Sequence, residues 1–299
     1  MSNFQIGDYA VESMLGEGAV AVVYRARRAA GRTDDVVDAQ PTAVALKILR
    51  PAALKQPQVL ASFQFEGRVL SRLKHPGILR VYETGDDDDQ FYTVMELIDG
   101  RDLDNYLRDR TRLPEAEAVD IAGQLAAALE YLHNQGYVHR DIKPSNILLN
   151  RTGRVVLADF GTVITISDGA PYELGVYGTP SYLAPEQIRM DAKIDGRADL
   201  YALGTMLYLM VAGRKPFYGT REQILEAHLH EPPPPPSEFS RISPHLEQII
   251  LRAVAKEPAD RFQSGEEFRA ALAAADLHTE APARSLRQRL FGWLSTSGQ

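Results

Sequence analysis

The chain has 299 residues, of which 44% are hydrophobic and 24% charged, and this globular composition excludes the collagen-like and disordered classes. Its 33 Lys and Arg against 40 Asp and Glu give a formal net charge of −7, which argues against a nucleic-acid partner. The chain has no cysteine, which excludes disulfides and cysteine nucleophiles and favours a reducing, cytoplasmic compartment.

The sequence shows no targeting or membrane-spanning segment. The first ten residues lack the basic and then apolar layout of a signal peptide. The longest apolar run, 201–213, is shorter than the ~20 residues that cross a bilayer, and it is typical of a helix buried on all sides. We therefore expect a cytoplasmic protein, membrane-associated only if the full-length protein continues into a transmembrane segment.

The first hundred residues are rich in short β-prone runs separated by Gly, Pro and Asp. These runs predict strands at 9–15, 19–26, 43–49 and 91–97. One helix is predicted at 57–73, and it stops before His75-Pro76-Gly77. The polar segment 29–41 predicts a long connection, and the acidic run 86–89 predicts a solvated hairpin tip.

From residue 99 onward the pattern becomes helical. Pro114, at a first helical position, begins a helix that ends at Gly136. Its apolar stripe comprises Ala118, Ile121, Ala122, Leu125, Leu129 and Leu132. Ser264 and Glu267 predict a capping box and a helix to about residue 274. The proline run 232–236 is either a ligand for a partner domain or, as we prefer, a rigid connector.

The predicted organisation is a strand-rich lobe at 1–98, a helical lobe at 99–275 and a tail at 276–299. The tail is juxtamembrane if the protein continues. Residues 285–294 combine arginines with apolar side chains that include Trp293, so membrane-surface docking, packing on the large lobe and terminal disorder all stay open.

Two glycines lie between the first two predicted strands. Glycine at positions 16 and 18 lets backbone N–H groups approach a phosphate closely. Alone, this is weak evidence for a nucleotide site, because a hairpin tip with two glycines is more common. Ala21 also stands where a third glycine would complete the G-x-G-x-x-G pattern.

Lys47 lies in the middle of an apolar strand. Strand alternation places it on one face with Ala45, where a lysine must extend to water or meet an anion. Glu66 interrupts the apolar stripe of the following helix in the same way. That stripe comprises Val59, Phe63, Leu70 and Leu73. The acid and the base are therefore either partners or two separate surface residues.

A polar loop and a glycine turn follow the long helix. The loop contains His139-Arg140-Asp141, Lys143 and Asn146, and the turn Asp159-Phe160-Gly161 ends a buried-looking strand. The side chains of Asp141, Asn146 and Asp159 offer oxygen ligands without a nitrogen or sulfur cage, which suits Mg²⁺ bound together with substrate phosphates.

Together these motifs resemble those of the protein kinase superfamily, specifically the bacterial serine/threonine kinases of eukaryotic type. The resemblance covers about residues 9–272. It is carried by Gly16, Gly18, Val23, Val44-Ala45-Leu46-Lys47, Glu66, His139-Arg140-Asp141, Asn146, Asp159-Phe160-Gly161, Ala184-Pro185-Glu186, Asp199 and Arg261. The resemblance implies an α+β, bilobal fold, with a small antiparallel-sheet lobe containing one key helix and a larger, mainly helical lobe.

The resemblance implies ATP as a substrate and a divalent cofactor. Lys47 would hold the α- and β-phosphates of ATP and would pair with Glu66. Asn146 and Asp159 would bind Mg²⁺, for which Mn²⁺ could substitute. The nucleotide-binding residues would be Leu15, Gly16, Glu17, Gly18, Val23, Ala45, Lys47, Met95, Glu96, Ile98 and Leu148.

The resemblance likewise assigns the residues that face the protein substrate. Asp141 would orient the substrate hydroxyl and accept its proton, and Lys143 would steady the γ-phosphate. Thr179 would hydrogen-bond both of these residues. The surrounding sequence resembles serine/threonine rather than tyrosine kinases.

Three further interactions are implied to be structural. They are a column of Leu70, Phe160 and His139, the Glu186–Arg261 ion pair, and bracing of the catalytic loop by Asp199. Met95 would be the gatekeeper beside the adenine.

The activation segment departs from the family pattern. Residues 170–177 contain no Ser or Thr, and Glu173 is their only charged residue. We expect either that Glu173 pairs with Arg140 in place of a phosphate, or that phosphorylation falls on Thr162, Thr165 or Ser167.

The leading hypothesis is an active kinase that binds ATP, phosphorylates proteins and, through self-association, phosphorylates itself. The alternatives are a pseudokinase scaffold and a small-molecule phosphotransferase. The presence of Lys47, Asp141 and Asp159 disfavours the former, and the intact Ala184-Pro185-Glu186 disfavours the latter.

Overall fold

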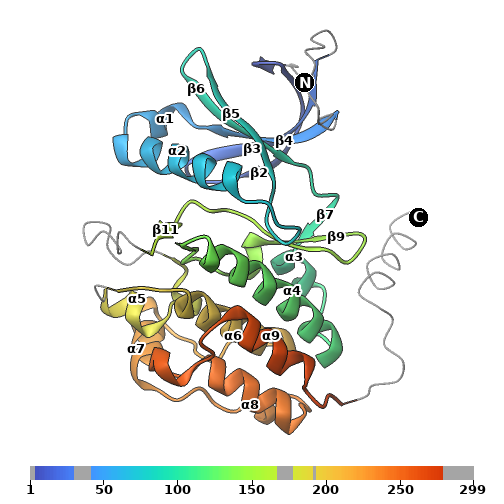
Figure 1. Cartoon of the computed structure of the whole chain (residues 1–299), viewed down its shortest axis with the longest axis vertical. Coiled ribbons are helices and arrows are strands. Elements are labelled where there is room, and N and C mark those ends of the chain that lie inside the picture. Colours follow the sequence, from blue (N-terminus) through green and yellow to red (C-terminus); the bar gives the residue numbers. More distant parts are fainter. Residues whose placement is uncertain (1–3, 30–41, 167–177, 191–192, 279–299) are drawn as a thin grey trace. The chain divides into compact units, whose positions relative to one another are not determined.

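The computed structural model describes residues 4–29, 42–166, 178–190 and 193–278, and the chain divides after Asp99 into two compact units (Figure 1). The first unit is built on an antiparallel sheet and the second is mainly helical. The fold class expected from the sequence is therefore confirmed.

A six-stranded antiparallel sheet, in the order β1-β2-β3-β4-β6-β5, forms the first unit. The elements of this unit are β1 (Gln5–Ile6), β2 (Tyr9–Glu17), β3 (Ala21–Arg28), β4 (Ala43–Leu49), α1 (Pro51–Leu54), α2 (Pro57–Arg72), β5 (Val81–Asp87) and β6 (Gln90–Glu96). Alternation along β4 places Val44, Leu46 and Ile48 in one apolar cluster. Leu49 points the other way and joins Phe63 of α2 in a second cluster.

Two hairpin tips in this unit differ from the sequence prediction. β2 reaches Glu17 and β3 begins at Ala21, so the prediction that Gly16 lies in a loop is wrong, and only residues 18–20 form the tip. In the acidic run, Asp86 and Asp87 end β5, while the turn residues Asp88 and Asp89 have φ of 46° and 64°. Two successive positive φ angles are typical of a tight hairpin turn, which the charge pattern alone does not reveal.

The second unit contains two small sheets and seven α-helices among the residues that the structure describes. Its strands are β7 (Gly100–Asp102), β8 (Tyr137–Val138), β9 (Ile147–Asn150), β10 (Val155–Leu157) and β11 (Ile164–Thr165). Its helices are α3 (Leu103–Arg108), α4 (Glu115–Asn134), α5 (Pro185–Arg189), α6 (Arg197–Ala212), α7 (Arg221–His230), α8 (Pro244–Ala253) and α9 (Gly265–Ala273). The sheets are β10-β9-β7 and β11-β8.

Helix α6 is the buried helix that the long apolar run predicts. All of its residues except Arg197 and Leu209 are buried, and it packs against α4 and α8. A Cβ on Gly204 would lie 2.5 Å from the Cβ of Ala253, so glycine is required where α6 and α8 cross. Because α6 is fixed on all sides, its Asp199 is a rigid anchor for the loops around it.

Both predicted helix starts in this unit need a small correction. Pro114 is the N-cap of α4 rather than its first helical residue, although the predicted apolar stripe is fully buried. Ser264 caps α9 by accepting the N–H of Glu267 at 3.0 Å. The Glu267 carboxylate accepts the N–H of Gln263 instead of that of Ser264, so only half of the predicted capping box forms.

Most of the predicted connection 29–41 and of the predicted tail 276–299 lies outside the described residues, which exclude 30–41 and 279–299. Among the helices that the structure describes, none combines the length and the apolar character needed to cross a bilayer.

Candidate active site

The sheet register aligns the glycine-containing end of β2 with Lys47. Val23 of β3 pairs with Gly16 on one side and with Lys47 on the other. The N–H of Gly18 donates to the carbonyl of Ala21 at 2.9 Å and closes the hairpin tip. A Cβ added to Gly16 would meet no atom within 4 Å, so the backbone there is open to a bound group.

Lys47 and Glu66 form the ion pair that their positions in the sequence suggest. The Lys47 Nζ donates to both carboxylate oxygens of Glu66 at 2.8 Å. The two side chains are 17% and 8% exposed, and the Nζ also lies 5.9 Å from the ring centroid of Phe63. Both charges are largely removed from water, so each depends on the other for compensation.

The residues expected around an adenine ring are divided between the two units. Ala45 and Met95 are paired across β4 and β6, and both are buried. Glu96 ends β6, and Leu15 of β2 is 51% exposed. Leu148 belongs to the second unit, in β9.

Asp199 of α6 holds the backbone that precedes Asp141. Its Oδ1 accepts the N–H of Arg140 at 2.8 Å, and its Oδ2 accepts the N–H of His139 at 2.9 Å. The same Oδ2 lies 2.9 Å from the Nε2 of His133. Burial acts to raise the pKa of Asp199, but the hydrogen bond and charge of His133 outweigh it, so the pKa is lowered and the carboxylate stays ionised. The predicted bracing by Asp199 is confirmed.

The carboxylate of Asp141 receives hydrogen bonds from three residues. The backbone N–H and the hydroxyl of Thr179 donate to its Oδ1 at 3.0 and 3.2 Å. Lys143 Nζ and Asn146 Nδ2 donate to its Oδ2 at 2.6 and 3.2 Å. A carboxylate fixed in this way can orient a hydroxyl group and accept its proton.

Asn146 and Asp159 are brought together by the backbone of the β9–β10 pair. The N–H of Ala158 donates to the Asn146 carbonyl at 2.9 Å, and Asp159 is the next residue. Asn146 Nδ2 donates to the Asp141 carbonyl at 2.9 Å, a bond that does not involve its amide oxygen. One amide oxygen and one carboxylate suit Mg²⁺, which usually binds few protein oxygens together with phosphates and water.

Two residues of this site have left-handed backbone conformations that are costly outside glycine. Asp159 has φ of 58° and Arg140 has φ of 68°. The hydrogen bond to Asp199 fixes Arg140. The His139 and Phe160 rings meet edge to face, with centroids 4.7 Å apart, and this contact holds the residue after Asp159. Leu70, the third member of the expected column, is buried in the first unit.

Two of the three candidate phosphorylation sites lie within the described residues. The Thr162 hydroxyl donates to the His139 carbonyl at 2.8 Å, and Arg140 Nε donates to the Thr162 carbonyl at 2.7 Å. Thr165 lies in β11. Ser167 and Glu173 lie outside the described residues.

Two supporting residues escape the sequence analysis. Gln187 Nε2 donates to the Arg140 carbonyl at 3.0 Å, and Lys215 Nζ donates to the Ser181 hydroxyl at 3.1 Å. Both bonds join residues that are more than thirty positions apart. No local periodicity or motif links such residues, so the sequence contains no signal that could have identified them.

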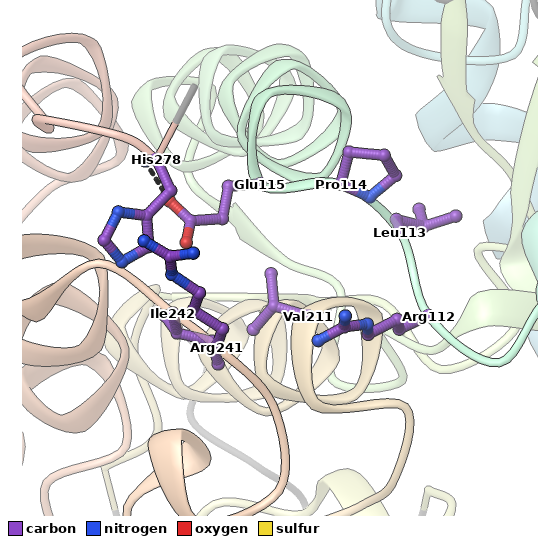
Figure 2. Close-up of a pocket in the computed structure, with 8 residues that line it drawn as sticks. All are labelled: Arg112, Leu113, Pro114, Glu115, Val211, Arg241, Ile242 and His278. Carbon is purple, nitrogen blue, oxygen red and sulfur yellow. Dashed lines mark hydrogen bonds between the residues drawn. The ribbon is translucent and has the colours of Figure 1, made fainter. Parts of the chain in front are cut away.

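A polar cavity of about 360 Å³ lies elsewhere in the second unit, and Figure 2 shows its lining. The Glu115 carboxylate accepts the N–H of His278 at 3.0 Å and that of Ser243 at 2.7 Å. Arg112 and Arg241 also line this cavity. None of the site residues described above belongs to its lining.

Comparison with known proteins agrees with this geometry. Residues 9–272 match the protein kinase domain family. The chain is 39% identical to the serine/threonine-protein kinase pkn3 of Myxococcus xanthus over 282 residues, which cover 90% of this chain and 50% of that protein. It is 37% identical to the serine/threonine-protein kinase PknJ of Mycobacterium tuberculosis, with 89% and 45% covered.

The fold is also similar to a solved structure. The crystal structure of the PknI kinase domain of Mycobacterium tuberculosis matches with a TM-score of 0.71 and 34% identity, covering 91% of this chain and 98% of that one. The chain spans half or less of the length of the two curated relatives named above. Because the family match covers most of the sequence and contains every site residue described above, the chain belongs to the protein kinase family.

Proposed function

We propose that the chain is a serine/threonine protein kinase domain, which transfers the γ-phosphoryl group of ATP to Ser and Thr hydroxyls of proteins. The observation that carries this proposal is the carboxylate of Asp141, fixed by hydrogen bonds from Lys143, Asn146 and Thr179. The names of the relatives support the same substrate class.

The first unit, residues 1–98, is proposed to bind the nucleotide. Lys47 would hold the α- and β-phosphates, and Glu66 would keep its ammonium group in place. Gly16 and Gly18 would let the backbone approach the phosphates. Val23, Ala45 and Met95 would contact the adenine, together with the backbone at 96–98.

The second unit, residues 99–275, is proposed to supply the groups that act on the transferring phosphoryl group. Asp141 would accept the proton of the substrate hydroxyl as the new P–O bond forms, and Lys143 would interact with the γ-phosphate. Thr179 lies at the start of a turn that continues to Tyr182, and its two bonds to Asp141 would couple the position of the substrate to that of the base.

Asn146 and Asp159 would hold Mg²⁺, or Mn²⁺ in its place, and the ion would neutralise charge on the phosphates. The protein's part would be to hold two oxygen donors near each other, and the backbone hydrogen bond between Ala158 and Asn146 supports this proposal. The cysteine-free composition supports a reducing, cytoplasmic site of action.

The proposed partners are ATP, protein substrates and a second copy of the chain during autophosphorylation. The candidate sites for that reaction are Thr162, Thr165 and Ser167. The Thr162 hydroxyl is already engaged by the His139 carbonyl, so its phosphorylation would break a contact within the catalytic loop.

Transfer of radiolabelled phosphate from ATP to a protein substrate tests the proposal. The wild-type chain should label Ser and Thr residues, and Asp141→Asn should reduce labelling to background. Asp104→Asn, which alters a surface carboxylate paired with Arg108, is the matched control and should behave as wild type. Equal labelling by wild type and Asp141→Asn, or labelling by neither, would refute the kinase assignment and favour a scaffold.

A further inference from the structure

Arg50 makes three contacts with the hairpin tip between β2 and β3. Its Nε donates to the Gly18 carbonyl at 3.0 Å, and its backbone N–H donates to the Val20 carbonyl at 2.9 Å. A guanidinium nitrogen, Nη2, forms an ion pair with the carboxylate of Glu17. The tip otherwise contains one internal backbone bond, from Gly18 to Ala21.

Arg50 is well placed to link this tip to the strand that contains Lys47. It follows the last residue of β4, Leu49, and that strand is paired with β3 from Ala21 onward. Its contacts therefore continue the β3–β4 pairing past the end of the strand. Leu49 and Ala21 also lie in one buried apolar cluster, so the base of the tip is fixed while its end depends on Arg50.

The ion pair also has an electrostatic consequence. Glu17 lies between the two glycines, and its carboxylate is a negative charge beside a segment that must accept phosphates. The Arg50 guanidinium compensates this charge. Without it, an anion approaching Gly16 and Gly18 would meet an uncompensated carboxylate on a less constrained loop.

We infer that Arg50 is a positioning residue for the phosphate-binding tip at residues 18–20, holding the backbone of Gly18 in place and neutralising the adjoining Glu17 of β2. The inference rests on the proposed function, because it assumes that this tip binds nucleotide phosphates. The ligand whose binding Arg50 would support is a nucleoside di- or triphosphate. Arg50 would not contact the phosphates itself, because it acts through Glu17 and Gly18.

The same sheet provides a control. Arg27 of β3 pairs with Glu12 of β2 at 2.8 Å, so it is another arginine–glutamate pair that involves β2. Its side chain is 57% exposed, and Glu12 lies five residues before Glu17 in the sequence. Replacing Arg27 removes one arginine charge and one ion pair without touching the tip, while Arg25 still pairs with Glu12 at 2.9 Å.

Calorimetric titration with MgADP and with adenosine provides the first test, on wild type, Arg50→Ala, Arg50→Lys and Arg27→Ala. Arg50→Ala should weaken MgADP binding about fivefold, which is about 1 kcal/mol at 1.4 kcal/mol per tenfold, and should leave adenosine binding unchanged. Arg50→Lys keeps the charge but lacks the Nε–H donor, so its loss should be smaller. Arg27→Ala should bind both ligands as wild type does.

Hydrogen exchange of the nucleotide-free protein provides the second test and needs no activity. The Gly18 amide should exchange faster in Arg50→Ala than in wild type or Arg27→Ala, because the tip loses its tether. Unchanged exchange, or equal MgADP affinities of wild type and Arg50→Ala, overturns the inference and leaves the kinase assignment standing. Failure of the wild type to bind MgADP overturns both.

Discussion

Arg261 donates to both carboxylate oxygens of Glu186, at 2.7 and 2.8 Å, and the two side chains are 0% and 5% exposed. The arginine also donates to the carbonyls of Ala255 and Lys256 at 2.8 Å. It therefore joins the segment after α8 to α5, which begins one residue before Glu186. The ion pair that the sequence resemblance implies is present and fully buried.

Breaking this ion pair should destabilise the protein strongly. Arg261→Ala leaves a buried carboxylate without its cation, and we expect a loss of about 3–5 kcal/mol in the free energy of unfolding. Chemical denaturation measures it. The control is Arg269→Ala, which breaks a surface pair with Glu266 and should cost less than about 1 kcal/mol. Similar losses in the two variants would contradict the structural role of Arg261.

Lys47→Met should abolish phosphoryl transfer. Loss of a charged group that positions phosphates costs on the order of 10³-fold or more in rate. The methionine side chain occupies the space of the lysine methylene groups, so the substitution opens no cavity. Steady-state labelling measures the rate, and circular dichroism confirms that the variant is folded. A variant that retains a tenth of the wild-type rate would show that Lys47 does not hold the phosphates.

Thr179→Ala should reduce kcat/KM for a protein substrate by about 10- to 100-fold, because a hydrogen bond to a charged group is worth about 1.5–3 kcal/mol. The hydroxyl donates to the Asp141 Oδ1 at 3.2 Å. Thr179→Ser retains the hydroxyl and should restore most of the activity. If the serine variant is as impaired as the alanine variant, loss of the hydrogen bond from the Thr179 hydroxyl does not explain the lower activity.

Stability should fall between about pH 6.5 and pH 4 because of His228 of α7. Burial, and then the charge of Lys256, lower the pKa of His228 to about 4. Its Nδ1 lies 2.7 Å from the Tyr201 hydroxyl, while its Nε2 has no hydrogen-bond partner among the described residues. The unfolded chain takes up a proton near pH 6.5 and the folded chain does not, so the stabilising contribution is complete above pH 6.5 and is lost as the pH falls through about 4.

The lowered pKa corresponds to a loss of roughly 3 kcal/mol across this range. Denaturant unfolding at several pH values measures it, and His228→Gln should show a smaller decrease. The control is His230→Gln, at an exposed position on the same helix, which should keep the wild-type dependence. Parallel pH profiles for all three proteins would exclude His228 as the source.

Local patterns in the sequence predicted the elements that bear the site and offered the Lys47–Glu66 contact as one of two alternatives. Alternation along residues 43–49 and the helical stripe through Glu66 each placed a charged residue on an apolar face, and the structure joins Lys47 to Glu66. Such patterns are visible because strand and helix periods are local properties of the chain. The same reasoning predicted the buried helix α6 and the buried stripe of α4.

Beyond the bracing by Asp199 that the family resemblance implies, only the tertiary structure decided how the catalytic loop is held. The contact between Asp199 and His133 spans 66 positions, and that between Gln187 and Arg140 spans 47. Such contacts depend on how α4, α5 and the buried α6 pack, which no single-element pattern encodes. The positive φ angles of Arg140 and Asp159 have the same origin, because packing and hydrogen bonds from distant residues impose a conformation that local propensity disfavours.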